Sequence, residues 1–328
     1  MGRLVWIILV VAVLLIGFII VVALDSQDEE IIKGQSGREI KTELNGVSLS
    51  PKSFGAGDFS SFFVKAKEAG EAITGGDELG QISDSSSASI VARFSSQYDY
   101  EPVILIGLKN TNNLNADKEK LRNLLEKQNI KYLGLGVEAN RYENYDAYAS
   151  AYNELFEMVK KISPDTQIFP IFQYEQMRGL RGGLFGAEND NGNAEWALLS
   201  MKADMIGFTT YPGLIYKNPD DIPDDYYSVI KQRINKPIVF TEIGWFREGP
   251  VGWESSDDEQ KLFVEKYFAL TNDLDVRLNI WSFLYDPDTD SLFRTMGLLE
   301  DSEETSPAFE AWKNGNYRKS LRNVRLLK

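Results

Sequence analysis

The chain contains neither histidine nor cysteine among its 328 residues. The lack of histidine excludes Ser-His-Asp and Cys-His catalysis and the common His-ligated zinc sites. The lack of cysteine excludes disulfides, thiol nucleophiles and thiolate metal sites. Acid–base chemistry therefore has to come from carboxylates, lysine, tyrosine or a cofactor. Paired carboxylates become the leading candidates by elimination.

Positive charge is also scarce, because the formal net charge is −14 and the isoelectric point is near 4.7. Such a surface repels phosphate backbones, so we expect no nucleic-acid partner. No glycine-rich dinucleotide fingerprint opens the first repeating unit, which argues against a nucleotide cofactor. The sequence also lacks the closely spaced carboxylates that would indicate a divalent metal site. We therefore predict neither a cofactor nor a bound metal.

One uncharged, strongly apolar run stands at the N-terminus, over residues 4–24. Its length is close to the ~20 residues that a helix needs to cross a bilayer. A cleaved signal peptide, the alternative, normally has a shorter apolar region of ~7–15 residues. Arg3 precedes the run and Asp25 follows it, so the positive-inside tendency leaves the N-terminus in the cytoplasm. We predict a single-pass membrane anchor over residues 1–24, with the rest of the chain on the extracytoplasmic side.

The remainder divides into a charged spacer (25–44), a long folded region (45–316) and a basic tail (317–328). Within the folded region, helix-like segments at 116–127, 145–161, 226–234 and 259–270 separate strand-like ones. The strand-like segments are Gly46–Ser50, Glu71–Thr74, Pro102–Leu108, Tyr132–Val137, Gln167–Phe172, Met205–Thr209, Pro237–Thr241 and Leu278–Ser282. Strict alternation implies parallel strands with right-handed crossovers. Eight such units fit the about 250 residues of an α/β (β/α)8 (TIM) barrel.

Two carboxylates come directly after predicted strands. Glu138 follows the fourth strand and Glu242 follows the seventh. Active sites of such barrels lie at the carboxyl ends of the strands, so both side chains are placed for chemistry. Glycoside hydrolysis needs two carboxylates, one to protonate the leaving oxygen and one to attack the anomeric carbon or activate water. The alternative is structural, with each glutamate capping a helix or pairing with an arginine.

Several segments resemble clan A glycoside hydrolases, most closely the endo-β-1,4-galactanase and β-1,3-glucanase families. They are 237–245 (PIVFTEIGW), 204–212 (DMIGFTTYP), 280–283 (IWSF), 297–300 (GLLE) and 306–312 (SPAFEAW), in the family's order along the second half of the barrel. The resemblance implies a (β/α)8 barrel, with Glu242 as the catalytic nucleophile and Glu138 as the general acid/base.

The sequence departs from this family at the fourth strand. The family pattern there is Gly-Asn-Glu, whereas this chain has Gly136, Val137 and Glu138. The family's asparagine contacts the 2-hydroxyl of the sugar, whose hydrogen bonds strengthen in the transition state. Asn140, two positions further on, is the candidate substitute.

Five further residues are predicted to contact substrate. The resemblance places Tyr211 near the nucleophile and Trp281 at the floor of the sugar site. Trp245 offers another aromatic face, although aromatic residues are also ordinary core material. Gln173 ends the fifth strand, and Asp77 follows the second, where loop solvation is the alternative.

One connection is unusually long, because residues 175–195 are rich in glycine and asparagine and follow the fifth strand. Such a loop is either a functional lid or a variable surface loop.

The leading hypothesis is a membrane-anchored, extracytoplasmic, retaining β-glycoside hydrolase that acts on a polysaccharide or surface glycan. A carbohydrate is then the expected partner, and the oligomeric state is left open. The alternative is a non-catalytic barrel that binds glycans or organises the cell envelope. A third reading is a barrel enzyme of another kind, such as a lyase or transglycosylase.

Overall fold

The computed structural model describes residues 43–190, 192, 194–300 and 305–315. The predicted anchor (1–24), most of the spacer (25–44) and the basic tail (317–328) lie outside the described residues. Within the described part of the chain, no helix has the length and apolarity needed to span a membrane.

A single parallel sheet forms the centre of the described fold. Its strands are β1 (Leu44–Ser48), β2 (Ala72–Glu78), β3 (Glu101–Gly107), β4 (Tyr132–Leu135), β5 (Gln167–Phe169), β6 (Ile171–Gln173), β7 (Ile206–Thr210), β8 (Ile238–Ile243) and β9 (Val276–Trp281). Their order is β5-β4-β3-β2-β1-β9-β8-β7-β6, so β1 pairs with the last strand, β9. Each predicted strand segment overlaps one of these strands, and the fifth segment overlaps both β5 and β6.

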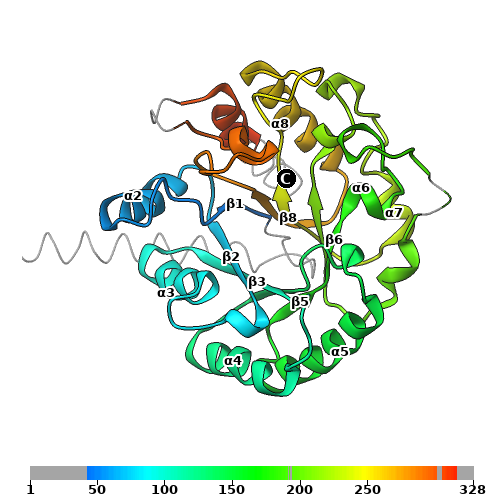
Figure 1. The fold of residues 1–328 in the computed structure, drawn as a ribbon. Coiled ribbons are helices and arrows are strands. Elements are labelled where there is room, and N and C mark those ends of the chain that lie inside the picture. The colour runs from blue at the N-terminus through cyan, green and yellow to red at the C-terminus, as the bar shows by residue number, and fades with distance from the viewer. Residues whose placement is uncertain (1–42, 191, 193, 301–304, 316–328) are drawn as a thin grey trace, which may run out of the picture. The chain divides into compact units, whose positions relative to one another are not determined.

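Pro170 divides the fifth strand into β5 and β6. Proline has no backbone N–H, so it interrupts the ladder of hydrogen bonds. The neighbouring groups continue that ladder on both sides, because Ile171 N donates to the Gly136 carbonyl (3.2 Å) and Gly207 N donates to the Pro170 carbonyl (2.9 Å). Residues 167–173 therefore act as one strand that joins β4 to β7. This joint closes an eight-stranded parallel barrel, which confirms the predicted barrel fold (Figure 1).

Helices surround the barrel, as Figure 1 shows. The α-helices are α2 (Ala56–Ala66), α3 (Ser87–Tyr98), α4 (Leu114–Lys127), α5 (Tyr145–Ile162), α6 (Tyr174–Met177), α7 (Val229–Arg233) and α8 (Asp257–Thr271), and residues 307–315 are also helical. The helix expected over 226–234 is shorter than predicted. Tyr226 and Tyr227 precede it in turns, with both side chains fully buried.

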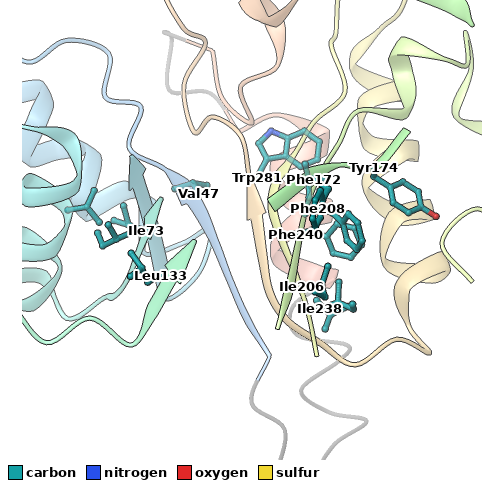
Figure 2. Close-up of a cluster of buried hydrophobic side chains, with 14 of the residues drawn as sticks. Val47, Ile73, Leu133, Phe172, Tyr174, Ile206, Phe208, Ile238, Phe240 and Trp281 are labelled. Atoms are coloured by element: carbon teal, nitrogen blue, oxygen red, sulfur yellow. The ribbon is translucent and has the colours of Figure 1, made fainter. Parts of the chain in front are cut away.

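The apolar core has two layers, because successive residues of a strand face opposite sides of the sheet. On β3, Val103 and Leu105 belong to the cluster inside the barrel, and Ile104 and Ile106 belong to the cluster between barrel and helices. Figure 2 shows part of the outer cluster, where side chains of β6, β7 and β8 pack beside Tyr174. Burial on both faces holds each strand in register, so the residues that follow the strands have defined positions.

Candidate active site

A cavity of about 470 Å³ opens at the carboxyl ends of the strands. Its wall includes Ser48 of β1, Gly76 of β2, Gly107 of β3 and Glu242 of β8, together with Phe283 after β9. This is the end of the barrel at which parallel (β/α)8 enzymes carry their active sites. Glu242 therefore lies where the sequence predicts it.

Glu242 is half-buried and is held by one strong hydrogen bond. The Tyr211 hydroxyl donates to its Oε2 at 2.5 Å and lies 3.0 Å from Ser282 Oγ. Gly244 makes room for this contact, because a Cβ there would lie 2.8 Å from the Tyr211 ring. The predicted neighbour of Glu242 on the sixth strand thus contacts it directly.

The environment favours the protonated form of Glu242. Burial, followed by the negative charge of Glu138, raises the pKa of Glu242 to about 7, and the hydrogen bond from Tyr211 opposes that rise. The same two carboxylates help to raise the pKa of the buried Tyr211 hydroxyl well above its usual value, where burial is the largest cause. Tyr211 therefore remains a hydrogen-bond donor across the physiological pH range.

Glu138 leaves β4 through two left-handed backbone positions, Gly136 (φ +84°) and Glu138 itself (φ 51°). Such a φ is uncommon for a residue other than glycine and is often found at functional sites. Its carboxylate accepts hydrogen bonds from Arg141 Nη1 at 2.6 Å and from Thr209 Oγ1 at 2.9 Å. Arg141 is the arginine partner that the structural alternative required.

Thr209 is a neighbour of both glutamates. It bonds Glu138 through its side chain, and in the β7–β8 ladder it is the register partner of Glu242. The negative charge of Glu138 also raises the pKa of Glu242, because the two carboxylates lie near each other. The structure therefore brings the two predicted catalytic glutamates together at one end of the barrel.

Two predicted aromatic contacts do not face the cavity. Trp281 and Trp245 are both 0% exposed, and both pack against Phe263 of α8. The Trp281 indole N–H donates to the Met296 carbonyl (2.8 Å), and that of Trp245 donates to Ser255 Oγ (3.0 Å). Neither ring is available to stack on a sugar.

Strand alternation explains the error for Trp281. Leu278 and Ile280 of β9 point into the barrel, so Trp281 points out towards the helices, in the layer that Figure 2 shows. Ser282 and Phe283, which follow it, line the cavity instead.

Asn140 and Gln173 form a structural pair. Asn140 accepts from Gln173 N (2.8 Å) and donates to the Gln173 carbonyl (3.1 Å), as a neighbouring strand would. The Gln173 side chain is buried and caps α6 by accepting from Gln176 N at 2.6 Å. The amide of Asn140 is thus engaged with backbone, and it does not take the place of the family's asparagine.

Asp77 has two roles in the structure. It lines the cavity, and it caps α3 by accepting from Ala88 N at 2.7 Å and Ser87 N at 3.3 Å. Glu78 lines the same cavity and accepts from Lys109 N at 3.1 Å. Glu78 and Thr209 were not among the predicted site residues. In the sequence, only a polar side chain at the end of a predicted strand could have indicated these two residues, and that is a weak indication.

No protein-family model and no curated protein matches the sequence. Solved structures do match the fold. An exo-β-1,4-mannosidase from Opitutaceae bacterium strain TAV5 superposes with a TM-score of 0.63 at 11% identity, over 86% of this chain and 60% of that one. A GH5_18 protein from Bifidobacterium longum subsp. infantis has a TM-score of 0.63 at 10% identity, over 84% and 79%.

A family 17 β-1,3-glucanosyltransferase from Rhizomucor miehei has a TM-score of 0.55 at 15% identity, over 83% of this chain and 97% of that one. The chain thus spans three fifths of the mannosidase and nearly all of the glucanosyltransferase. At these identities the likeness shows the fold alone. The shared fold is the parallel (β/α)8 barrel that the sequence resemblance predicts.

The raised pKa of Glu242 predicts a pH-dependent cost in stability. Between its ordinary value near 4.5 and about 7, the unfolded chain releases the proton while the folded chain retains it. Stability attributable to this group is therefore fully present below pH 4.5 and is lost as the pH rises through 7. We expect Glu242→Gln to increase the free energy of unfolding at pH 8, relative to pH 4, by up to about 3 kcal/mol.

Urea denaturation of wild type and variant at both pH values measures this difference. The matched control is Glu126→Gln on the exposed face of α4, which should change the free energy of unfolding by less than about 0.5 kcal/mol. An equal effect of Glu242→Gln at pH 4 and pH 8 contradicts the assigned environment.

Proposed function

We propose that the protein is a retaining β-glycoside hydrolase that acts on a polysaccharide or surface glycan. The observation that carries this proposal is the proximity of Glu138 and Glu242 beside a cavity at the carboxyl end of the barrel, where Thr209 bonds Glu138 and is the neighbour of Glu242 in the sheet. Two carboxylates in one cleft are the minimum that glycoside hydrolysis requires. The fold supports the same reading, because the similar solved structures include a mannosidase and a glucanosyltransferase of glycoside hydrolase family 17.

In the proposed reaction Glu242 attacks the anomeric carbon and Glu138 protonates the departing oxygen. A covalent glycosyl ester forms on Glu242 as the glycosidic C–O bond breaks. Glu138 then removes a proton from water, which attacks the anomeric carbon and releases Glu242. Tyr211 holds Oε2 of Glu242, so Oε1 is the attacking atom.

Arg141 binds the carboxylate of Glu138, the proposed acid/base. It is ion-paired with Glu138 at 2.6 Å, and its side chain is half exposed. A general acid has to carry a proton, so Glu138 has to leave this pair when substrate enters. The exposure of Arg141 allows that movement without disturbing the core.

The pH dependence of hydrolysis tests which carboxyl is the nucleophile. With the pKa of Glu242 at about 7, a nucleophilic Glu242 is lost to protonation below that pH, so kcat/KM should fall about tenfold per unit towards acid. The measurement is kcat/KM for an aryl β-glycoside between pH 4 and pH 9. A loss on the alkaline side of pH 7, with full activity at pH 5, assigns the acid role to Glu242 instead.

Removal of each carboxylate tests the catalytic pair. On a panel of β-glucans, galactans, mannans and arabinans, we expect Glu242→Ala and Glu138→Ala each to lower hydrolysis by about 10³-fold or more. Added azide should rescue Glu242→Ala on an activated substrate and give the α-glycosyl azide, because it replaces the nucleophile. It should give the β-product with Glu138→Ala. If wild type and Glu242→Gln behave alike on every substrate bound, catalysis at this site is refuted.

A non-catalytic glycan-binding or cell-envelope barrel is the second candidate. Two observations favour it: Val137 lines the cavity where the family carries asparagine, and Glu138 is already ion-paired with Arg141. This candidate predicts glycan binding by calorimetry with no turnover of the bound glycan. Hydrolysis that depends on both glutamates excludes it.

We also propose that residues 4–24 anchor the protein in the cell membrane with the barrel outside the cytoplasm. The support is the apolar length of that run and the charges on either side of it. The full-length protein should remain with membranes after alkaline carbonate extraction, and protease added to intact cells should digest the barrel. Release by carbonate, or protection from the protease, refutes the anchor or the orientation.

A further inference from the structure

Glu175 is a buried carboxylate that the proposed reaction does not use. It lies in α6, directly after β6, and its side chain is 0% exposed. Burial raises the pKa of Glu175 to about 6, although hydrogen bonds to the carboxylate oppose the rise. A buried carboxyl group is costly unless its oxygens are hydrogen-bonded, so its partners indicate what it does.

Three donors converge on one oxygen of Glu175. Oε1 accepts from Thr210 Oγ1 (2.8 Å), from the Tyr226 hydroxyl (2.8 Å) and from the backbone N–H of Tyr211 (3.1 Å). Oε2 accepts from Gln173 Nε2 at 2.5 Å. The carboxylate thus connects the end of β6, the end of β7 and the turn before α7.

The contact with Tyr211 N completes the sheet at its rim. The β6–β7 ladder ends with the pair Gln173 and Thr209, because the chain turns into α6 after Gln173. The next amide on that side, Tyr211 N, directly follows β7 and has no strand carbonyl to face. Glu175 supplies the acceptor that a buried N–H needs.

Tyr211 links this outer network to the cavity. Along β7 and its continuation, Thr209 contacts Glu138, Thr210 contacts Glu175, and Tyr211 contacts Glu242 through its hydroxyl. Successive side chains of a strand point to opposite faces of the sheet, so Thr209 and Tyr211 point to the cavity side and Thr210 points to the outer side. Glu175 and Glu242 therefore hold the same residue, one at its amide and the other at its hydroxyl.

We infer that Glu175 is a positioning residue, which fixes the backbone of Tyr211 so that the phenol hydroxyl reaches Oε2 of Glu242. The catalytic consequence rests on the proposed function, but the geometric one does not. Misplacement of a group at a catalytic centre by about 1 Å can cost about 10²-fold in rate, so such a support has a measurable effect.

A carboxylate is required at this position because of Gln173. Its amide N–H donates to Glu175, while its carbonyl oxygen caps α6. A glutamine at position 175 either directs its own NH₂ at that of Gln173 or turns it towards the three donors on Oε1. Exchange of the two residue types, Gln173→Glu with Glu175→Gln, restores one donor and one acceptor between them.

The test measures the pKa of Glu242 by NMR of protein with ¹³C-labelled glutamate side chains. The variants are Tyr211→Phe, Glu175→Ala and the double variant. The Tyr211 hydrogen bond lowers the pKa of Glu242, so its loss in either single variant should raise that pKa by about one unit. The double variant should match Tyr211→Phe. Removal of the Glu175 charge alone would lower the pKa, so the sign distinguishes lost positioning from a charge effect.

The inference is overturned if the pKa of Glu242 is unchanged or lowered in Glu175→Ala. It is also overturned if the two single-variant shifts in this pKa add up in the double variant. If Glu175→Ala does not fold, Glu175→Gln is compared with the exchanged pair, which should return the pKa of Glu242 towards the wild-type value. Failure of the exchanged pair to differ from Glu175→Gln overturns it equally. Thr166→Ala is the matched control, because Thr166 makes a buried hydrogen bond to the Ile130 carbonyl at the start of β5. It should lower Tm and leave the pKa of Glu242 unchanged.

Kinetics separate this inference from the proposed function. Where the wild type hydrolyses an aryl glycoside, Glu175→Ala and Tyr211→Phe should each lower kcat about tenfold or more, with a smaller change in KM. A wild type without turnover but with the expected titration pattern refutes the hydrolase and leaves the positioning role intact. Turnover with an unaffected Glu242 titration supports the hydrolase and refutes the positioning role of Glu175.

Discussion

Closure of the hydrogen-bonded ladder is the constraint on which the rest of this structure depends. The pairing of β1 with β9 and the joint at Pro170 convert a row of parallel strands into a ring. Parallel strands in a ring all end on one face. Residues that are far apart in sequence, such as Asp77, Glu138 and Glu242, therefore meet at that face. A slip of one residue in any strand would turn these side chains away from the site.

Three successive residues at the end of β7 bond three acidic side chains. Thr209 bonds the carboxylate of Glu138 on the inner side, and Thr210 bonds that of Glu175 on the outer side. Tyr211 then completes the contact with Glu242. In a chain without histidine, carboxyl groups are left to hold protons near neutrality, and burial is what raises the pKa of Glu242 and Glu175 into that range. The same burial costs folding stability, as is common at functional sites.

The fold of this protein and the chemistry of its site depend on different residues. The barrel superposes on solved structures at sequence identities of 10–15%, which shows how few positions a (β/α)8 fold prescribes. Function depends on the few residues at the strand ends. There the chain keeps two carboxylates and the tyrosine but has Val137 beside the cavity and Arg141 on Glu138. Val137 departs from the pattern that the sequence resembles, and the pair with Arg141 is the arrangement that the structural alternative predicts.

The sequence by itself determined the eight repeating units and the position of Glu138 and Glu242 at strand ends, because short apolar strand segments and their alternation with helices are local features of the chain. Only the tertiary structure decided which face each strand-end side chain takes and what it bonds. Trp281 and Trp245 turned out to be core, and Asn140 pairs with the backbone of Gln173. Glu175 gained its partners from β7 and the turn before α7. Hydrogen-bond partners and burial depend on segments distant in sequence, and so does the pKa of Glu242.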